Sequence, residues 1–249
     1  MKWPEKKAFS FEQHTILAGY MGSHSHGTYI PPKKGGIDDK DIMGICVPPE
    51  RYYTGLQKFE QVQVFVEEYD VIIYEAKKYV SLLLKSNPNV MGLLWLSDNL
   101  YVKRTKWGEE LIENRQEFVS KEAYKSFTGY AYSQLIKMEN NACNGFMGAK
   151  RRQLIEEHGY DTKNAAHLIR LLRTGIEVLS TGQLNVFRED AQQLMAIKKG
   201  EYSLDKIKVM AEDLFKVAQS ALIHSKIPDK PNFEKAEQIL IKCIRENLW

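Results

Sequence analysis

The sequence predicts an α+β protein, in which a small mixed sheet with flanking helices is followed by an α-helical C-terminal region. Two observations carry this prediction. Short β-rich runs separated by Gly and Pro occupy the first part of the chain, at residues 15–20, 42–47, 62–66 and 70–74. Beyond about residue 100, apolar residues recur instead at helical spacing.

Helical spacing is clearest after Asp161 and Thr162, two residues suited to cap a helix. The apolar stripe that follows consists of Leu168, Leu171, Leu172, Ile176 and Leu179. Further helices are expected at residues 121–139, 149–158, 188–198, 203–224 and 233–247.

A polar, weakly patterned segment at residues 103–117 predicts the boundary between the two regions. We therefore expect a first domain at residues 1–110 and a helical domain at residues 111–249. With 249 residues and 43% hydrophobic content, the chain is long enough for two domains that each bury a core.

Composition constrains the class of protein without naming a partner. The 35 Lys and Arg against 32 acidic residues give a formal charge of only +3, so nucleic-acid binding would need a local basic surface. The three cysteines, Cys46, Cys143 and Cys243, show no metal-ligand spacing and favour a reducing compartment. Since no run approaches the ~20 apolar residues of a membrane span, we expect a cytoplasmic protein.

Two carboxylates one residue apart, Asp39 and Asp41, stand at the start of an apolar run. On a strand both side chains would project from one face, separated by roughly 7 Å of backbone rise. Mg²⁺ commonly combines one or two protein carboxylates with substrate phosphates, so we expect a site for Mg²⁺, or Mn²⁺, and a nucleoside triphosphate. Two-metal chemistry needs a third acid on a neighbouring strand. Asp70, which opens a β-branched run, is the first candidate, and Glu68, two residues earlier on the same strand face, is the second.

A Gly-Ser turn precedes these acids. Gly22 permits backbone conformations that a Cβ forbids, and its amide and the Ser23 hydroxyl are suited to contact terminal phosphates. Between turn and acids, the loop at residues 31–36 (PPKKGG) carries two lysines that could meet phosphate or a nucleic acid, or form a solvated turn.

The helix after Asp161 supplies possible substrate contacts. Asn164, His167 and Arg170 recur at three-residue intervals beside the apolar stripe, with Lys163 close by. Arg170 is suited to phosphate, and His167 or Asn164 to a base or sugar. Equally, His167 could be a hydrogen-bonded residue between helices and Arg170 a surface cation.

The motifs at residues 22–27 (GSHSHG) and 38–45 (DDKDIMGI) resemble the active-site signature of the DNA polymerase β nucleotidyltransferase superfamily. Four further segments resemble the branch of this superfamily associated with RNA repair. They are residues 70–90, which end in KSNPNV, 159–173 (GYDTKNAAHLIRLLR), 182–186 (GQLNV) and 197–203 (IKKGEYS).

The resemblance implies a polymerase-β-like catalytic head and a helical domain that binds substrate or nucleotide. It implies that Asp39 and Asp41 bind the metal, that Asp70 is the third acid, and that Gly22 and Ser23 contact phosphate. The implied activity is transfer of a nucleoside monophosphate to an acceptor hydroxyl, with an RNA end as the acceptor that the RNA-repair branch suggests.

This sequence departs from the branch pattern in two ways. The interval between Ser23 and Asp39 is longer than usual, and Asp38 stands where a small polar residue is common, which keeps Asp38 as an alternative ligand. Three other interpretations remain open. They are transfer to a protein or small molecule, a non-catalytic nucleotide- or RNA-binding module, and a component of a toxin–antitoxin pair.

Overall fold

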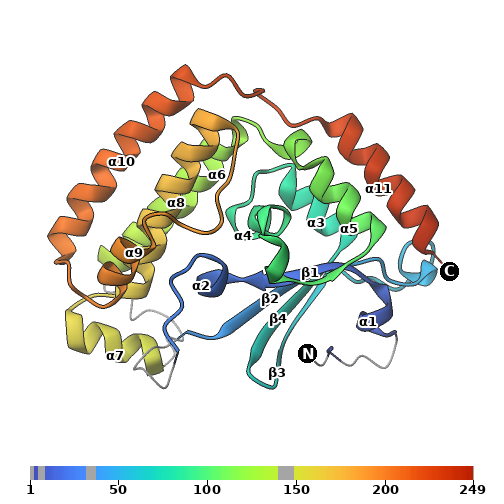
Figure 1. Ribbon diagram of the computed structural model, residues 1–249, viewed down its shortest axis with the longest axis horizontal. Helices are drawn as coiled ribbons and strands as arrows, with labels where there is room; N and C mark the ends of the chain where they lie inside the picture. Colours follow the sequence, from blue (N-terminus) through green and yellow to red (C-terminus); the bar gives the residue numbers. More distant parts are fainter. Residues whose placement is uncertain (1–2, 5–8, 32–37, 140–148, 249) are drawn as a thin grey trace. The chain divides into compact units, whose positions relative to one another are not determined.

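The computed structural model describes residues 3–4, 9–31, 38–139 and 149–248, and it divides into two compact units (Figure 1). The first, the sheet unit, consists of Met1–Phe118 and Pro231–Trp249, and the second, the helical unit, of Val119–Lys230. The loop expected at residues 31–36 lies, except for Pro31, outside the described residues, as does Cys143.

The sheet unit is built on five strands in the order β3-β4-β2-β1-β5. The strands are β1 (Thr15–Met21), β2 (Lys40–Cys46), β3 (Gln61–Val66), β4 (Tyr69–Glu75) and β5 (Tyr101–Arg104). β2 and β4 run parallel and the other neighbours antiparallel, which confirms the expected mixed sheet. β5, a short strand whose sequence ends in Lys103 and Arg104, was not predicted.

Alternation along the strands separates the two faces of the sheet. One face packs into a cluster of Ile42, Cys46, Val71 and Ile73 with Phe9 and Phe11, which lie at and just before the short helix α1 (Phe11–His14). Figure 1 shows α3 (Ala76–Leu83), α4 (Pro88–Met91) and α5 (Lys106–Glu113) on the opposite side of the sheet.

Helix α3 begins where β4 ends because Glu75 caps it. Its carboxylate accepts hydrogen bonds from the backbone N–H groups of Lys77 and Lys78, both at 2.8 Å, and from the Tyr53 hydroxyl at 2.7 Å. Ala76, Tyr79, Val80 and Leu83 form the buried face of α3. The last residue of β4 is thereby fixed, which holds the register of that strand.

The helical unit contains α6 (Glu122–Glu139), α7 (Ala149–His158), α8 (Thr162–Thr181), α9 (Ala191–Lys198) and α10 (Leu204–His224). Asp161 caps α8 as expected, since its side chain accepts a hydrogen bond from Asn164 N at 2.9 Å. Gly182, at φ +70°, ends the helix in the left-handed conformation common after a helix. The predicted stripe is largely confirmed, with Leu168, Leu171, Leu172 and Leu179 buried.

The last helix, α11 (Phe233–Asn247), belongs to the sheet unit, whereas the sequence placed it in the helical domain. Its buried residues Ala236, Ile239 and Cys243 face the sheet unit, and Asn232 N donates a hydrogen bond to Glu117 O at 2.8 Å. Helical periodicity shows only that α11 has an apolar face, not which core buries it. The structural boundaries therefore fall near residues 118 and 231 instead of at 110 alone.

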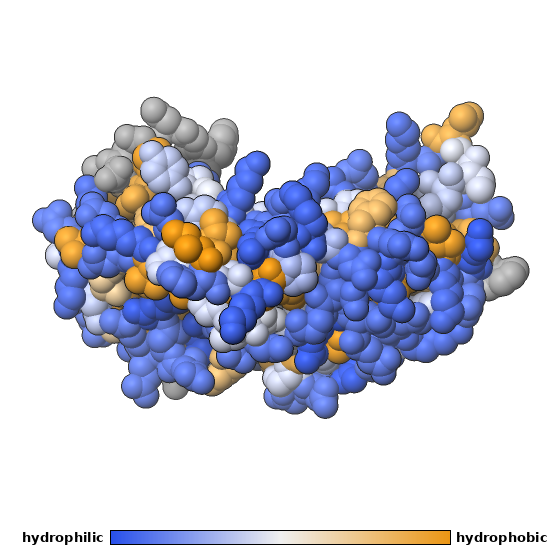
Figure 2. Space-filling view, turned by 90° about the horizontal axis from the view of Figure 1, so that it is seen from above, coloured by the Kyte–Doolittle hydropathy of each residue, from blue (hydrophilic) through white to orange (hydrophobic). Residues whose placement is uncertain are grey.

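The surface shown in Figure 2 is mostly hydrophilic, with small separate apolar patches. Within the described part of the chain, no helix combines the length and apolar character needed to cross a membrane.

Candidate functional site

Asp41 and Asp70 are direct partners in the parallel pairing of β2 with β4. Residues paired in this way project to the same face of the sheet, and neighbouring strands lie about 4.8 Å apart. Both side chains are partly exposed, because they stand near the open ends of their strands. The fold thus brings together two carboxylates that are 29 residues apart in the chain.

Gly22 lies against the first of these acids. β1 pairs with β2 so that Met21 is opposite Asp41, and Gly22 follows at φ +62°. A Cβ at Gly22 would stand 1.9 Å from Oδ2 of Asp41. A side chain here would displace the Asp41 carboxylate, and the positive φ would strain any residue other than glycine.

Ser23 belongs to the short helix α2 (Gly22–Ser25), which its own backbone holds in place. The Ser25 hydroxyl and the His26 N–H both donate to Gly22 O, at 3.0 and 3.2 Å, and Thr28 N donates to Ser23 O at 3.0 Å. The Ser23 hydroxyl makes no hydrogen bond to any described residue. It is partly exposed next to Gly22, so it can donate to a ligand.

Asp38 and Asp39 have different surroundings although they are adjacent. Asp38 is 2% exposed, and its Oδ2 accepts a hydrogen bond from Ile30 N at 2.8 Å. Asp39 is partly exposed and immediately precedes β2, which begins at Lys40 and not at Asp39. Asp38 therefore anchors the segment after α2, and Asp39 is the more accessible of the two.

Of the two candidates for the third acid, Asp70 is the one placed beside Asp41. Glu68 was expected on the same strand face as Asp70, but it lies in the two-residue turn between β3 and β4, after Glu67 at φ +56°. There it forms an ion pair with Lys40, which lowers the pKa of Glu68. The turn therefore separates Glu68 from the strand position that sequence spacing gave it.

Gln63, which the sequence reasoning did not single out, holds Asp70 in place. Its Nε2 donates to both carboxylate oxygens of Asp70, at 3.1 and 3.0 Å. Phe65, directly opposite Asp70 on β3, is 71% exposed. The alternation of β3 was the available signal, since Val62, Val64 and Val66 lie on one face and Gln61, Gln63 and Phe65 on the other.

The donor set is one that Mg²⁺ or Mn²⁺ accepts. All the side chains in question offer carboxylate oxygens, the ligands that hard divalent cations prefer. Among the described residues, no group of three or more His, Cys, Asp or Glu side chains converges closely enough to hold an ion. Since Mg²⁺ takes one or two carboxylates and completes its shell with water and phosphate, Asp41 with Asp70 or Asp39 is a sufficient protein contribution.

The other predicted contacts, Lys163, His167 and Arg170, lie in the helical unit on one side of α8. The His167 ring packs edge-on against Tyr130 of α6, with centroids 5.4 Å apart. Burial lowers the pKa of His167 well below its usual value, and nearby cations lower it further. Asn164, another candidate, is already engaged by Arg151 at 2.6 Å and by the cap of α8.

Comparison with known proteins gives one family match. Residues 5–242 match the model of a family described as "RNA repair pathway DNA polymerase beta family". No curated protein matches the chain. Among solved structures, a nucleotidyltransferase-like protein from Exiguobacterium sibiricum is similar at 12% identity and a TM-score of 0.30, covering 94% of this chain and 74% of that one.

Proposed function

The chain belongs to the RNA repair pathway DNA polymerase beta family, and on that premise we propose that it moves a nucleoside monophosphate from a nucleoside triphosphate to an acceptor hydroxyl. Pyrophosphate is the second product. The observation that carries the proposal is the pairing of Asp41 with Asp70, with Gly22 packed against the Asp41 carboxylate. Two acids beside a backbone that admits no side chain suit the binding of a metal-bound phosphate chain.

Each residue of this site has a separate task in the proposed reaction. The Gly22 N–H and the Ser23 hydroxyl donate hydrogen bonds to the terminal phosphates. Asp41, with Asp70 or Asp39, would provide the oxygen ligands for Mg²⁺ or Mn²⁺. Such an ion, when bound, supplies positive charge that stabilises the transition state and the departing pyrophosphate.

Asp70 also acts on the acceptor. Its carboxylate orients the acceptor hydroxyl and accepts its proton as the oxygen attacks the α-phosphorus. A new phosphorus–oxygen bond forms to the acceptor, and the bond from the α-phosphorus to the bridging oxygen breaks. Gln63 is a positioning residue here, because its two hydrogen bonds fix the Asp70 carboxylate.

An RNA end is the acceptor we propose. The family description supports it, and so does Phe65, whose ring is 71% exposed opposite Asp70. Alternation along an edge strand would place a polar residue there, whereas an exposed aromatic ring offers a surface on which an RNA base can stack. We propose that Phe65 stacks on a base near the reacting hydroxyl.

We assign the helical unit to nucleotide binding, with Lys163, His167 and Arg170 as its contacts. All three residues lie on one side of α8, and Lys163 and Arg170 are cations suited to phosphate oxygens.

The decisive experiment incubates the protein with each labelled nucleoside triphosphate, Mg²⁺, and pooled cellular RNA or protein. Label in RNA with stoichiometric pyrophosphate supports the proposal, and label in protein would redirect it to a protein acceptor. The Asp39→Ala, Asp41→Ala double variant should lose the release of pyrophosphate while keeping its circular dichroism spectrum. Undiminished release by that variant would overturn the assignment of the site.

A further inference from the structure

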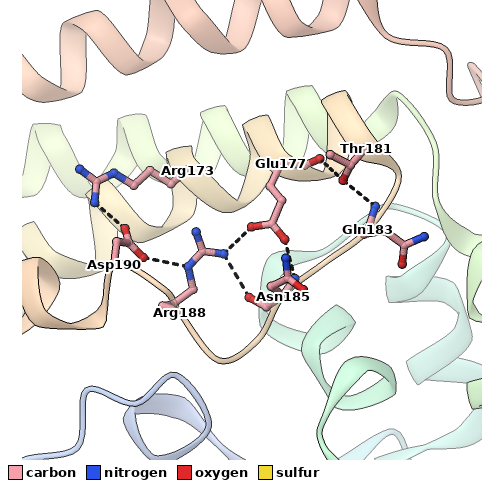
Figure 3. A network of polar contacts seen from close by, with 7 residues as sticks. All are labelled: Arg173, Glu177, Thr181, Gln183, Asn185, Arg188 and Asp190. Atoms are coloured by element: carbon pink, nitrogen blue, oxygen red, sulfur yellow. Dashed lines mark hydrogen bonds and ion pairs between the residues drawn. The ribbon is translucent and has the colours of Figure 1, made fainter.

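On the polar side of α8, some arginine side chains are paired with carboxylates and another has no such pairing among the described residues. Figure 3 shows Arg173 bound to Asp190, and Arg188 bound to both Asp190 and Glu177. Glu177 also accepts a hydrogen bond from Asn185 N at 2.6 Å, and Arg173 donates to Gln193 at 2.6 Å. Both oxygens of Asp190 are thus occupied by these two arginines.

Arg170 stands one turn before Arg173 and has no such partner. It makes no hydrogen bond or ion pair with any residue that the structure describes. Burial, together with the charge of Arg188, lowers the pKa of Arg170 to about 10, against smaller opposing effects of Tyr130 and Asp190. A guanidinium group carries five N–H donors, and leaving them unsatisfied among protein atoms costs free energy.

His167, three residues earlier on the same side of α8, has a second unsatisfied atom. Its Nε2 is buried and has no hydrogen-bond partner among the described residues. Burial lowers the pKa of this histidine most, and cations on α6, α7 and α8 lower it further. They belong to Arg170, Arg151, Lys163 and Lys137.

The excess of positive charge is local. Arg151 is neutralised by Asp161, at 2.5 Å, but no carboxylate of the described residues engages Arg170 or Lys137. The Arg170 guanidinium and the His167 Nε2, which both lack hydrogen-bond partners among the described residues, lower the stability of the free protein. An anion bound there would remove both penalties.

The chemistry favours phosphate among anions. A guanidinium group matches two oxygens of a phosphate with two parallel hydrogen bonds, and a dianion interacts favourably with several cations at once. A metal ion is disfavoured, because the charges around His167 would repel it. The ligand class is therefore a phosphate or polyphosphate group that binds without a metal.

We propose that Arg170, His167 and Lys163 of α8, with Lys137 and Tyr130 of α6, form a metal-independent binding site for a phosphate group. That phosphate belongs to the triphosphate of the nucleotide or to the end of an RNA. Its place in a transfer reaction rests on the function proposed above, whereas phosphate binding itself does not.

The test is calorimetric titration of the full chain with sodium tripolyphosphate in the presence of EDTA. Arg170→Gln should weaken binding by at least ~10-fold, because it removes charge-assisted hydrogen bonds. The control is Lys216→Gln, which removes one cation from an exposed ion pair with Asp213 on α10 and should bind as the wild type does. Equal affinity of the Arg170→Gln protein and the wild type would refute the proposal.

Thermal unfolding separates a binding role from a structural one. Arg170→Gln should keep or raise the melting temperature, since it removes a charge that no described residue pairs with. Tripolyphosphate should raise the melting temperature of the wild type and not that of the variant. A lower melting temperature with unchanged affinity for tripolyphosphate would show that Arg170 is structural, and would overturn the site.

Further arms identify the source of the phosphate. ATP is compared with oligoribonucleotides that end in a 5′-phosphate or a 5′-hydroxyl group, all in EDTA. If Arg170→Gln weakens the binding of ATP alone, the site binds the nucleotide. If it weakens the binding of the 5′-phosphorylated RNA alone, the site binds the RNA end. The Asp39→Ala, Asp41→Ala protein should bind tripolyphosphate normally, so failure of the catalytic proposal and of this one are separate results.

Discussion

The backbone of Gly22 and the carboxylate of Asp41 are packed so closely that a Cβ on Gly22 would lie 1.9 Å from Asp41 Oδ2. The two residues meet because β1 ends opposite Asp41, and the chain then turns at a φ of +62°. The phosphate-binding turn and the metal-binding acid are therefore mechanically linked in the proposed site.

Gly22→Ala should abolish nucleotidyl transfer with only a modest loss of fold stability. The added methyl group displaces the Asp41 carboxylate, and the strained φ costs on the order of 1–2 kcal/mol. Pyrophosphate release and the urea midpoint are the two measurements. Ser25→Ala, in the same turn, is the control for general disturbance of α2 and should retain most activity. Wild-type activity in the Gly22→Ala protein would contradict the proposed role of this contact.

Asp70→Asn and Glu68→Gln should differ sharply. Asp70 faces Asp41, so loss of its charge should lower kcat at least ~100-fold, the usual scale for a general base or metal ligand. Glu68 is exposed and paired with Lys40, and its loss should change kcat less than about twofold. Both substitutions replace a carboxylate with the corresponding amide, and the two residues are only two positions apart in the chain. A comparable loss in both proteins would show that the turn acid takes part in the reaction.

Phe65→Ala should impair the acceptor step and not the nucleotide step. Stacking of one base contributes about 1–3 kcal/mol, so KM for the RNA acceptor should rise while KM for the nucleoside triphosphate stays constant. Phe65→Trp should restore RNA binding because it keeps an aromatic surface. If both variants use RNA as the wild type does, Phe65 does not contact the acceptor.

Arg188→Ala should destabilise the helical unit by roughly 2–4 kcal/mol, because it leaves Glu177 and Asp190 partly buried without their shared partner. Lys216→Ala, which breaks an exposed pair, should cost less than about 1 kcal/mol. Urea unfolding followed by circular dichroism measures both. Similar unfolding free energies for the two variants would show that the network of Figure 3 contributes little.

The stability of the helical unit should fall as the pH drops below about 6.5. The folded-state pKa of His167 lies well below the usual 6.5, so the unfolded chain binds a proton first and each pH unit favours unfolding by up to about 1.4 kcal/mol. The charges that face this ring belong to Lys137 from α6, Arg151 from α7, and Lys163 and Arg170 from α8, with Tyr130 against the ring.

Hydrogen exchange of α8 amides, measured between about pH 8 and about pH 5, checks this dependence. His167→Gln should remove the part of it that arises from this residue. His224→Gln, which changes an exposed histidine of α10, should leave it intact. A wild-type dependence that survives in the His167→Gln protein would show that another group is responsible.

The long helices of the second half of the chain were predicted closely. Helices α6, α7, α10 and α11 lie within one residue of their predicted ranges, since periodicity and caps are local signals. β5 escaped notice because it is four residues long and half polar. Its strand character comes from pairing with β1, which is remote in sequence.

Prediction of the site was uneven for the same reason. The kinds of residue in the site could be predicted, because carboxylates before an apolar run and a Gly-Ser turn are local sequence patterns. Alternation along β3 shows only which face Gln63 lies on, and its contact with Asp70 depends on the hairpin register of β3 and β4. The position of Glu68 was also misread, because two residues of turn stand where continuous strand was assumed.

The sequence by itself determined the first four strands, the long helices of the second half, the acids, the glycine turn and the cations of α8. Tertiary structure alone decided that Asp70 stands beside Asp41, that Gly22 touches the Asp41 carboxylate, and that α11 joins the sheet unit. The physical reason is that periodicity and capping act over a few residues. Strand pairing and burial of an apolar face instead depend on which distant segments meet, and no local pattern specifies that.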